Sequence, residues 1–245
     1  MNMIPIEIFI ALIFVVAFLY STVGHGGASG YLAIMAIAGI SPSLMKSSAL
    51  ILNLFVAGVA FISFYRAGHF KWKILWPFAI TSMPMAFIGA QLSIHPQAYK
   101  IILGICLFVA VLWMLLKYRL AERPLKEPSL PIALVAGSIL GLVSGIIGIG
   151  GGILLSPLLI LLNWSTIKQT AGVSAAFIVL NSISGLVGLI QKGFTMDRHS
   201  MLWILAAFAG GILGSYAGSR KLSVSGLQYI LAGVLCFAAV KLMIF

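Results

Sequence analysis

The sequence is poor in charged residues, and its few acids lie outside the apolar segments. Only 8% of the 245 residues are charged, against about 25% in an ordinary soluble domain. Of the four acids, Glu122, Glu127 and Asp197 lie in polar loops, and Glu7 lies at the edge of an apolar segment. Proteins that carry cations through membranes, and many proton relays, place Asp or Glu along the path. The sequence therefore argues against a cation or metal substrate.

Cysteine is also scarce, and the residue sets typical of a metal centre or an enzyme are missing. Cys106 and Cys236 each lie in an apolar segment without a CxxC pattern, so we interpret both as small core residues. His69, His95 and His199 lie in loops and lack metal-ligand spacing. No nucleophile is accompanied by a base and an orienting acid. The sequence thus predicts no metal site, no cofactor and no enzymatic activity.

Hydrophobic residues, by contrast, make up 62% of the chain and form a series of long apolar stretches. These stretches are residues 6–23, 28–40, 49–65, 74–92, 101–116, 130–147, 153–162, 171–190, 201–217 and 227–245. Most are long enough for a helix that crosses a membrane, which needs about 20 residues, but the second and seventh are too short. We expect an all-α polytopic protein of the cell membrane, or of the inner membrane in a double-membraned bacterium, with the lipid bilayer as its surroundings.

The net charge of +11 comes from Lys and Arg residues in short loops between the apolar stretches. The positive-inside rule explains this pattern better than a nucleic-acid partner does, so we expect no nucleic acid to bind. The longest of these loops is the basic linker KYRLAERPLKEPSLP, from Lys117 to Pro131.

Two glycine-rich breaks interrupt the apolar stretches: VGHGGASG, residues 23–30, and IIGIGGGI, residues 146–153. We call them the first break and the second break. Glycine inside a helix costs about 1 kcal/mol relative to alanine, so clustered glycines need a reason. Non-helical backbone at membrane depth is found only where protein or a water-filled cavity satisfies its N–H and C=O groups. Each break therefore points to an internal binding site, although close helix packing is the alternative reason for such glycines.

The two breaks belong to a duplicated chain. Gly26 and Gly27 match Gly150 and Gly151 at an offset of 124 residues, and the RAGHF and QKGFT loops match at an offset of 125. We therefore predict a first transmembrane repeat at residues 1–117, a linker at 118–129 and a second repeat at 130–245. Asn53 and Asn181 are not in register and are not paired by this duplication.

The orientation of the repeats depends on how each begins. A helix over residues 6–40 would be about 50 Å long, well over the roughly 30 Å of a hydrocarbon core. We therefore expect a glycine-broken hairpin followed by three spanning helices in each half, which makes the halves inverted repeats. An even number of crossings per half gives the same bias of positive charge, so the charges leave the parity open. The cation-free N-terminus fits an external start and favours inversion.

An interior without carboxylates suits an anion, which can be held by backbone N–H groups, half-helix dipoles, hydroxyls and amides. The predicted substrate-binding residues are Thr22, Gly24, His25, Gly26, Gly27, Ser29, Asn53, Ser144, Gly148, Gly150, Gly151, Gly152, Ser156, Thr170, Ser174 and Asn181. We expect Ser156 and Pro157 to be the N-cap and first residue of a helix aimed into the site, whereas Ser41-Pro42 is expected to lie in a loop.

Several of these side chains also have a purely structural interpretation. His25 is the only titratable group in the breaks and could bind an anion or carry a proton, but a neutral histidine between helices fits equally well. Thr170, Ser174 and Asn181 share one helical face, and interhelical hydrogen bonds alone would explain them and Asn53. Lys46 could attract anions to an entrance, but interfacial snorkelling is the simpler interpretation.

These motifs have a family likeness. The segments GHGGASGYLAIM and GIGGGILLSPLL, followed by ISPSLMKSSA and NWSTIKQTAG, resemble the sulfite exporter TauE/SafE family of membrane permeases over nearly the whole chain. The first break departs from the family pattern, because His25 and Ala28 interrupt its glycine run. The resemblance implies a secondary transporter, an exporter of small sulfur-containing anions such as sulfite or organosulfonates. The alternative is a membrane-embedded enzyme or assembly factor that uses the bent helices as a groove. The sequence does not predict an oligomeric state.

Overall fold

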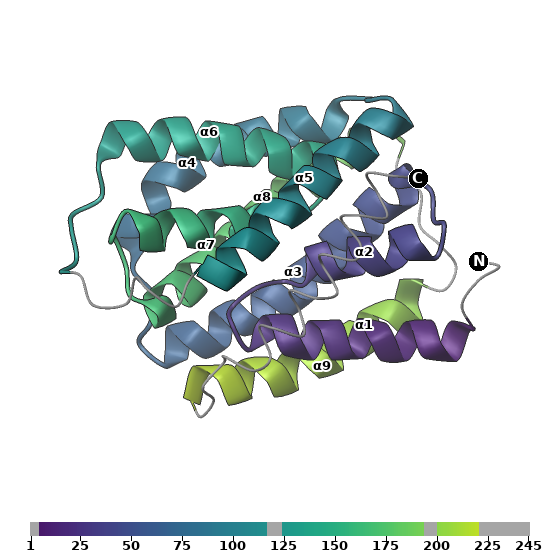
Figure 1. Ribbon diagram of the computed structural model, residues 1–245, viewed down its shortest axis with the longest axis horizontal. Helices are drawn as coiled ribbons and strands as arrows, with labels where there is room; N and C mark the ends of the chain where they lie inside the picture. The colour runs from purple at the N-terminus through teal and green to yellow at the C-terminus, as the bar shows by residue number, and fades with distance from the viewer. Residues whose placement is uncertain (1–4, 117–123, 194–199, 221–245) are drawn as a thin grey trace.

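The computed structural model describes residues 5–116, 124–193 and 200–220, and within these ranges every regular element is an α-helix (Figure 1). The helices are α1 (Ile6–Ser21), α2 (Ala28–Ile37), α3 (Pro42–Arg66), α4 (Trp72–Gln91), α5 (Pro96–Leu116), α6 (Leu130–Ile147), α7 (Gly152–Leu161), α8 (Ile167–Gln191) and α9 (Ser200–Arg220). The expected all-α fold is confirmed. The last apolar stretch, residues 227–245, lies outside the described residues, as does Cys236.

Five of these helices, α3, α4, α6, α8 and α9, are long and apolar enough to cross a membrane. Their outward side chains include Ile80, Val135 and Ile190, each more than 60% exposed, as expected of surfaces that face lipid. The two stretches that looked too short to span form α2 and α7, which have 10 residues each. The chain is thus a multi-pass membrane protein.

Each short helix begins at a glycine with left-handed backbone geometry. The N-cap of α2 is Gly27, with φ of 90°, and the N-cap of α7 is Gly151, with φ of 77°. Residues other than glycine rarely adopt these angles, which explains why both breaks are rich in glycine. At the first break the N–H of Gly24 donates to Ser21 O and the N–H of His25 donates to Tyr20 O, so α1 ends in a Schellman motif.

The duplication is visible in the backbone. Apart from Gly150, the residues with positive φ in the described part of the chain form matched pairs at offsets of 124 or 125 residues. The pairs are Gly24 with Gly148, Gly27 with Gly151, Gly39 with Asn163, and Gly68 with Gly193. The helix contacts are matched as well. By the same offsets, α4 corresponds to α9, α6 to α1 and α8 to α3. In one group α4 packs on α6 and α8, and in the other α9 packs on α1 and α3. Between these groups, α3 packs against α8.

Rows of glycines bring the outer helix pairs together. On α6, Gly141 lies so close to α4 that an added Cβ atom would overlap the backbone of Ser82. On α9, Gly214 likewise lies against the carbonyl of Phe18 on α1. Each glycine is the middle of three spaced four residues apart, residues 137, 141 and 145 on α6 and residues 210, 214 and 218 on α9. We call these two rows the glycine ladders; they allow close packing of the kind that small residues give membrane helices.

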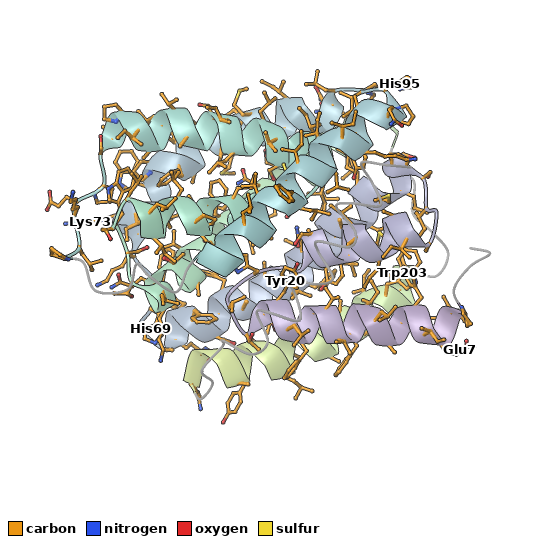
Figure 2. The ribbon with its side chains drawn as sticks, in the orientation of Figure 1. Glu7, Tyr20, His69, Lys73, His95 and Trp203 are labelled. Atoms are coloured by element: carbon orange, nitrogen blue, oxygen red, sulfur yellow. The ribbon has the colours of Figure 1, made fainter. Side chains whose placement is uncertain are left out.

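The long helices connect two ends of the molecule. The start of α8 lies beside the α3–α4 loop, where the Gly172 backbone meets the carbonyl of His69. The other end of α8 lies beside the end of α4, because Lys192 Nζ donates to Gln91 O at 2.7 Å. We call these the Arg66 end and the Lys192 end. Figure 2 shows His69 and Lys73 on the left of the molecule and His95 at the upper right.

The first helices of the two halves run in opposite directions in Figure 1, α1 from right to left and α6 from left to right. The short helices that follow point away from each other, with their N-terminal ends toward the middle of the molecule. This arrangement places the two breaks next to one another and the C-terminal ends of the short helices far apart.

Candidate functional site

The two breaks meet between the middles of α3 and α8. An added Cβ atom at Gly26 would overlap Asn53 Oδ1 and lie 3.2 Å from Ile178 Cγ2. At Gly150 it would lie 2.8 Å from Asn53 Nδ2 and 2.8 Å from Ile178 Cγ2. Both breaks therefore contact the same two side chains. We call Gly26, Gly150, Asn53, Ile178 and the adjoining Ser182 the centre.

The polar side chains of the centre are fully buried and unpaired. Asn53 has 0% exposure, and neither its Oδ1 nor its Nδ2 atom has a hydrogen-bond partner in the described part of the protein. The same is true of the Ser182 hydroxyl. An unpaired buried polar group costs about 1–3 kcal/mol, so two of them beside non-helical backbone make the centre a candidate site.

The backbone adds hydrogen-bond donors at the same place. The short helices α2 and α7 start from Gly27 and Gly151, and neither helix has a side-chain cap. The first N–H groups of a helix have no carbonyl partner within it, and the helix dipole makes this end positive. The α7 start is in contact with the centre, since an added Cβ at Gly152 would overlap Ile178 Cδ1. Such helix ends are suited to bind an anion.

The outer glycines of the breaks pack on the opposite half. Gly24 lies against the backbone of Ala171 in the first turn of α8, and Gly148 lies against Lys46 in the first turn of α3. Lys46 is only 7% exposed, and its Nζ donates to Ala90 O at 2.7 Å. The ammonium group thus caps the end of α4, where a helix favours positive charge. Neither earlier interpretation of Lys46, an entrance charge or interfacial snorkelling, included this capping contact.

His25 extends from the first break to the second half. Its Nδ1 lies 3.0 Å from Val23 O, and its Nε2 lies 3.0 Å from the Ser156 hydroxyl on α7. Ser156 Oγ is in turn 2.8 Å from the hydroxyl of Ser174 on α8. We call His25, Ser156 and Ser174 the relay. It joins α7 and α8 to the first break.

Three predicted site residues lie elsewhere. The Thr22 hydroxyl donates to Leu19 O at 2.6 Å, within its own helix. Ser29 donates to the Tyr20 hydroxyl at 2.8 Å, and Thr170 lies 2.6 Å from the Ser165 hydroxyl. These groups are buried and paired with their neighbours, so the structure does not bring them to the centre.

The remaining predicted residues flank the centre. Gly27 faces the Tyr31 ring, and Gly151 lies between the Phe177 ring and Ser144. The Ser144 hydroxyl and the Asn181 amide are fully buried and have no partner among the described residues. They add unpaired polar groups on α6 and α8.

The prediction for Ser156 and Pro157 is wrong. The α7 helix starts at Gly152, one turn earlier, because the left-handed glycine Gly151 can serve as its N-cap. Ser156 therefore lies inside the helix, where its side chain joins the relay. The Ser-Pro pattern does mark a helix start at Ser41 and Pro42, which open α3 where we expected a loop.

The sequence interpretation missed Ile178 and Ser182. Together with Ser174 they are spaced by four along α8 and so share one helical face. The duplication could have identified the first of them, because Ile178 stands at an offset of 125 residues from Asn53. An apolar residue opposite an amide was not an obvious partner.

Comparison with known proteins shows the family of the chain. The family model for the sulfite exporter TauE/SafE matches residues 9–242. A protein of Sinorhizobium fredii named probable membrane transporter protein y4hK is 37% identical over 234 residues, which cover 94% of this chain and 95% of the relative. A Sinorhizobium protein named probable membrane transporter protein ORF9 is 27% identical and covers 90% and 86%. No solved structure matches the chain.

Proposed function

Because the chain belongs to the sulfite exporter TauE/SafE family of membrane transporters, we propose that it exports small sulfur-containing anions, such as sulfite or an organosulfonate, through the centre. The family is one of transporters, which argues against the alternative of a membrane-embedded enzyme or assembly factor. The observation that carries the choice of an anion is the approach of Gly26 and Gly150, each one residue before a helix N-cap, to the unpaired amide of Asn53.

The groups around the centre can bind an oxyanion without a counter-charge. The first N–H groups of α2 and α7, Asn53 Nδ2 and the Ser182 hydroxyl are hydrogen-bond donors to sulfite or sulfonate oxygens. Neutral donors bind an anion less tightly than a salt bridge does, which suits a transporter that must release its substrate. The glycines, which have no Cβ atom, allow backbone donors to approach the anion closely.

We also propose that the halves are inverted repeats that rock around the centre. The matched backbone angles, the exchanged helix contacts and the opposite directions of α1 and α6 support this model. The positive-inside rule then assigns the Arg66 end to the cytoplasm. Its cations include Arg66, Lys71, Lys73 and Lys168, whereas the Lys192 end has Lys46, Lys100 and Lys192.

Inversion predicts that the two corresponding loops are labelled from opposite sides of the membrane. Lys71→Cys and Asp197→Cys, each introduced into a chain without Cys106 and Cys236, are to be treated with a membrane-impermeant maleimide. In right-side-out vesicles we expect Asp197→Cys alone to react, and in inverted vesicles Lys71→Cys alone. Reaction of both sites from the same side would overturn the inverted model.

Flux in proteoliposomes tests the proposed substrate class. We expect saturable movement of labelled sulfite or sulfoacetate, which an excess of the unlabelled anion slows and an excess of a neutral analogue leaves unchanged. Liposomes with the Gly214→Leu variant, whose α1–α9 packing is disrupted, provide the background rate. If no oxyanion moves faster than this background, the proposed function is wrong.

A further inference from the structure

The relay has no counterpart in the other half. By the offsets of the duplication, His25, Ser156 and Ser174 correspond to Ile149, Leu32 and Ala49. These three residues are apolar, and each is at most 3% exposed. His25 is only half-buried. The first break is therefore in contact with polar groups, whereas the corresponding positions around the second break are occupied by apolar side chains.

The hydrogen bonds of the relay define the proton positions of the neutral ring. Val23 O can only accept, so the proton lies on Nδ1, which donates to it. Nε2 of the neutral imidazole then accepts from the Ser156 hydroxyl, which accepts from Ser174. The available acceptor is thus Nε2, and a chain of two hydroxyls leads from it to α8.

The same relay can also accommodate the charged ring. When Nε2 gains a proton it becomes a donor to Ser156 Oγ, and both serine hydroxyls rotate so that Ser156 donates to Ser174. In this arrangement no two hydrogen-bond donors of the relay point at each other. A carboxylate is not needed to hold the imidazolium, provided that a negative charge binds nearby.

That negative charge would bind at the centre. His25 immediately precedes Gly26, which contacts Asn53. We propose that His25 takes up one proton for each monoanion that binds at the centre, so that transport is coupled to a proton. This inference rests on the proposed function. Binding of the anion and of the proton then strengthen each other, because linkage between two sites is reciprocal.

The proton step is balanced. On binding, the Nε2 lone pair forms an N–H bond to a proton donated by water or buffer. On release, the same bond breaks and the proton leaves with the anion. A monoanion and a proton carry no net charge together, so the coupled step is electroneutral. Membrane potential then has no direct effect on it.

Other titratable groups lie on the elements around His25. They are Tyr20 on α1, with Glu7 in the first turn of the same helix, Tyr31 on α2, Lys168 at the start of α8 and His69 in the α3–α4 loop; α7 has none. Tyrosine and lysine ordinarily titrate near pH 10, above the range in which histidine changes charge. His69 is the one other group to control for. Burial, and then the charge of Lys168, lower its pKa from the ordinary value.

Methanesulfonate is a suitable probe because it stays a monoanion throughout the pH range of histidine. Proteoliposomes that contain a pH dye are used to measure the flux of labelled methanesulfonate or sulfite together with the change in internal pH. The membrane potential is set by potassium and valinomycin. For the wild type we expect one proton per methanesulfonate, no effect of potential, and affinity that rises up to about tenfold per unit fall in pH.

His25→Gln keeps a side-chain amide for Ser156 but cannot titrate. We expect its ratio of protons to anions to fall at least about tenfold and its flux to become sensitive to potential. The matched control is His69→Gln, which should keep the wild-type ratio. Ser156→Ala should shift the pH dependence of anion flux, because Nε2 loses its partner.

The outcomes separate the two proposals. Anion flux by the wild type without accompanying protons overturns the coupling and leaves the proposed function intact. Absence of flux for both anions overturns both. If only sulfite moves, a wild-type sulfite flux that responds to potential as strongly as that of His25→Gln overturns the coupling. With methanesulfonate, the wild-type measurement is decisive even if His25→Gln does not fold.

Discussion

Asn53→Asp is expected to reduce anion flux at pH 7.5 by at least about a hundredfold. Aspartate has the shape of asparagine, so the packing between the breaks is retained, but a carboxylate replaces the amide that faces Gly26 and Gly150. Two like charges 4 Å apart repel by about 4 kcal/mol at an effective dielectric constant of about 20, which is roughly a thousandfold in affinity. The measurement is initial flux of labelled sulfite in proteoliposomes.

Two further measurements distinguish this result from misfolding. Flux through Asn53→Asp should recover as the pH falls, because the buried carboxyl group becomes neutral when protonated. Asn53→Leu should be inactive at every pH yet melt at a higher temperature than the wild type, since it removes a fully buried amide without partners. An Asn53→Leu protein that is less stable and still active would return Asn53 to a structural role.

Gly150→Ala is expected to lower flux at least about tenfold, and more than backbone strain alone can explain. Gly150 has φ of 72°, and a Cβ atom there would lie 2.8 Å from both Asn53 Nδ2 and Ile178 Cγ2. An alanine at this position therefore destabilises the left-handed backbone by about 1–2 kcal/mol. It also displaces the side chains of Asn53 and Ile178.

Gly68→Ala is the matched control. Gly68 has φ of 77°, but an added Cβ there would meet no atom within 4 Å. Alanine at position 68 therefore has the same backbone strain as alanine at position 150 but does not contact Asn53 or Ile178. Gly150→Ala should lose more thermal stability than Gly68→Ala because of the added contact, and only Gly150→Ala should lose flux. Equal flux in the two variants would mean that the approach of Gly150 to Asn53 does not matter for transport.

Much of the fold could be predicted from the sequence because lipid imposes simple rules. Length and hydropathy predicted the short helices α2 and α7, and the glycine clusters predicted where α1 and α6 end. These features depend on local backbone geometry and on burial. Such properties are encoded within a few neighbouring residues.

The centre was harder to predict because it depends on which side chains meet across helices. Thr22 and Ser29 lie close to the first break in sequence, but each binds a neighbouring group of its own helix hairpin. Ile178 lies far away in sequence and contacts both breaks. Lys46 had the charge expected at an entrance and instead caps α4. Hydropathy and spacing do not contain these tertiary contacts.

The two glycine ladders have an evolutionary consequence. Both come from the second half, on α6 and α9, and each packs on bulkier residues of the first half, on α4 and α1. If two copies of the first half were joined, neither α1–α4 interface would have a ladder, and the backbones would be held apart. With two copies of the second half, glycine would face glycine and leave a gap. The packing surfaces of the two halves are thus complementary to each other. Neither half is expected to pair with a second copy of itself, as a common ancestor of both would have done.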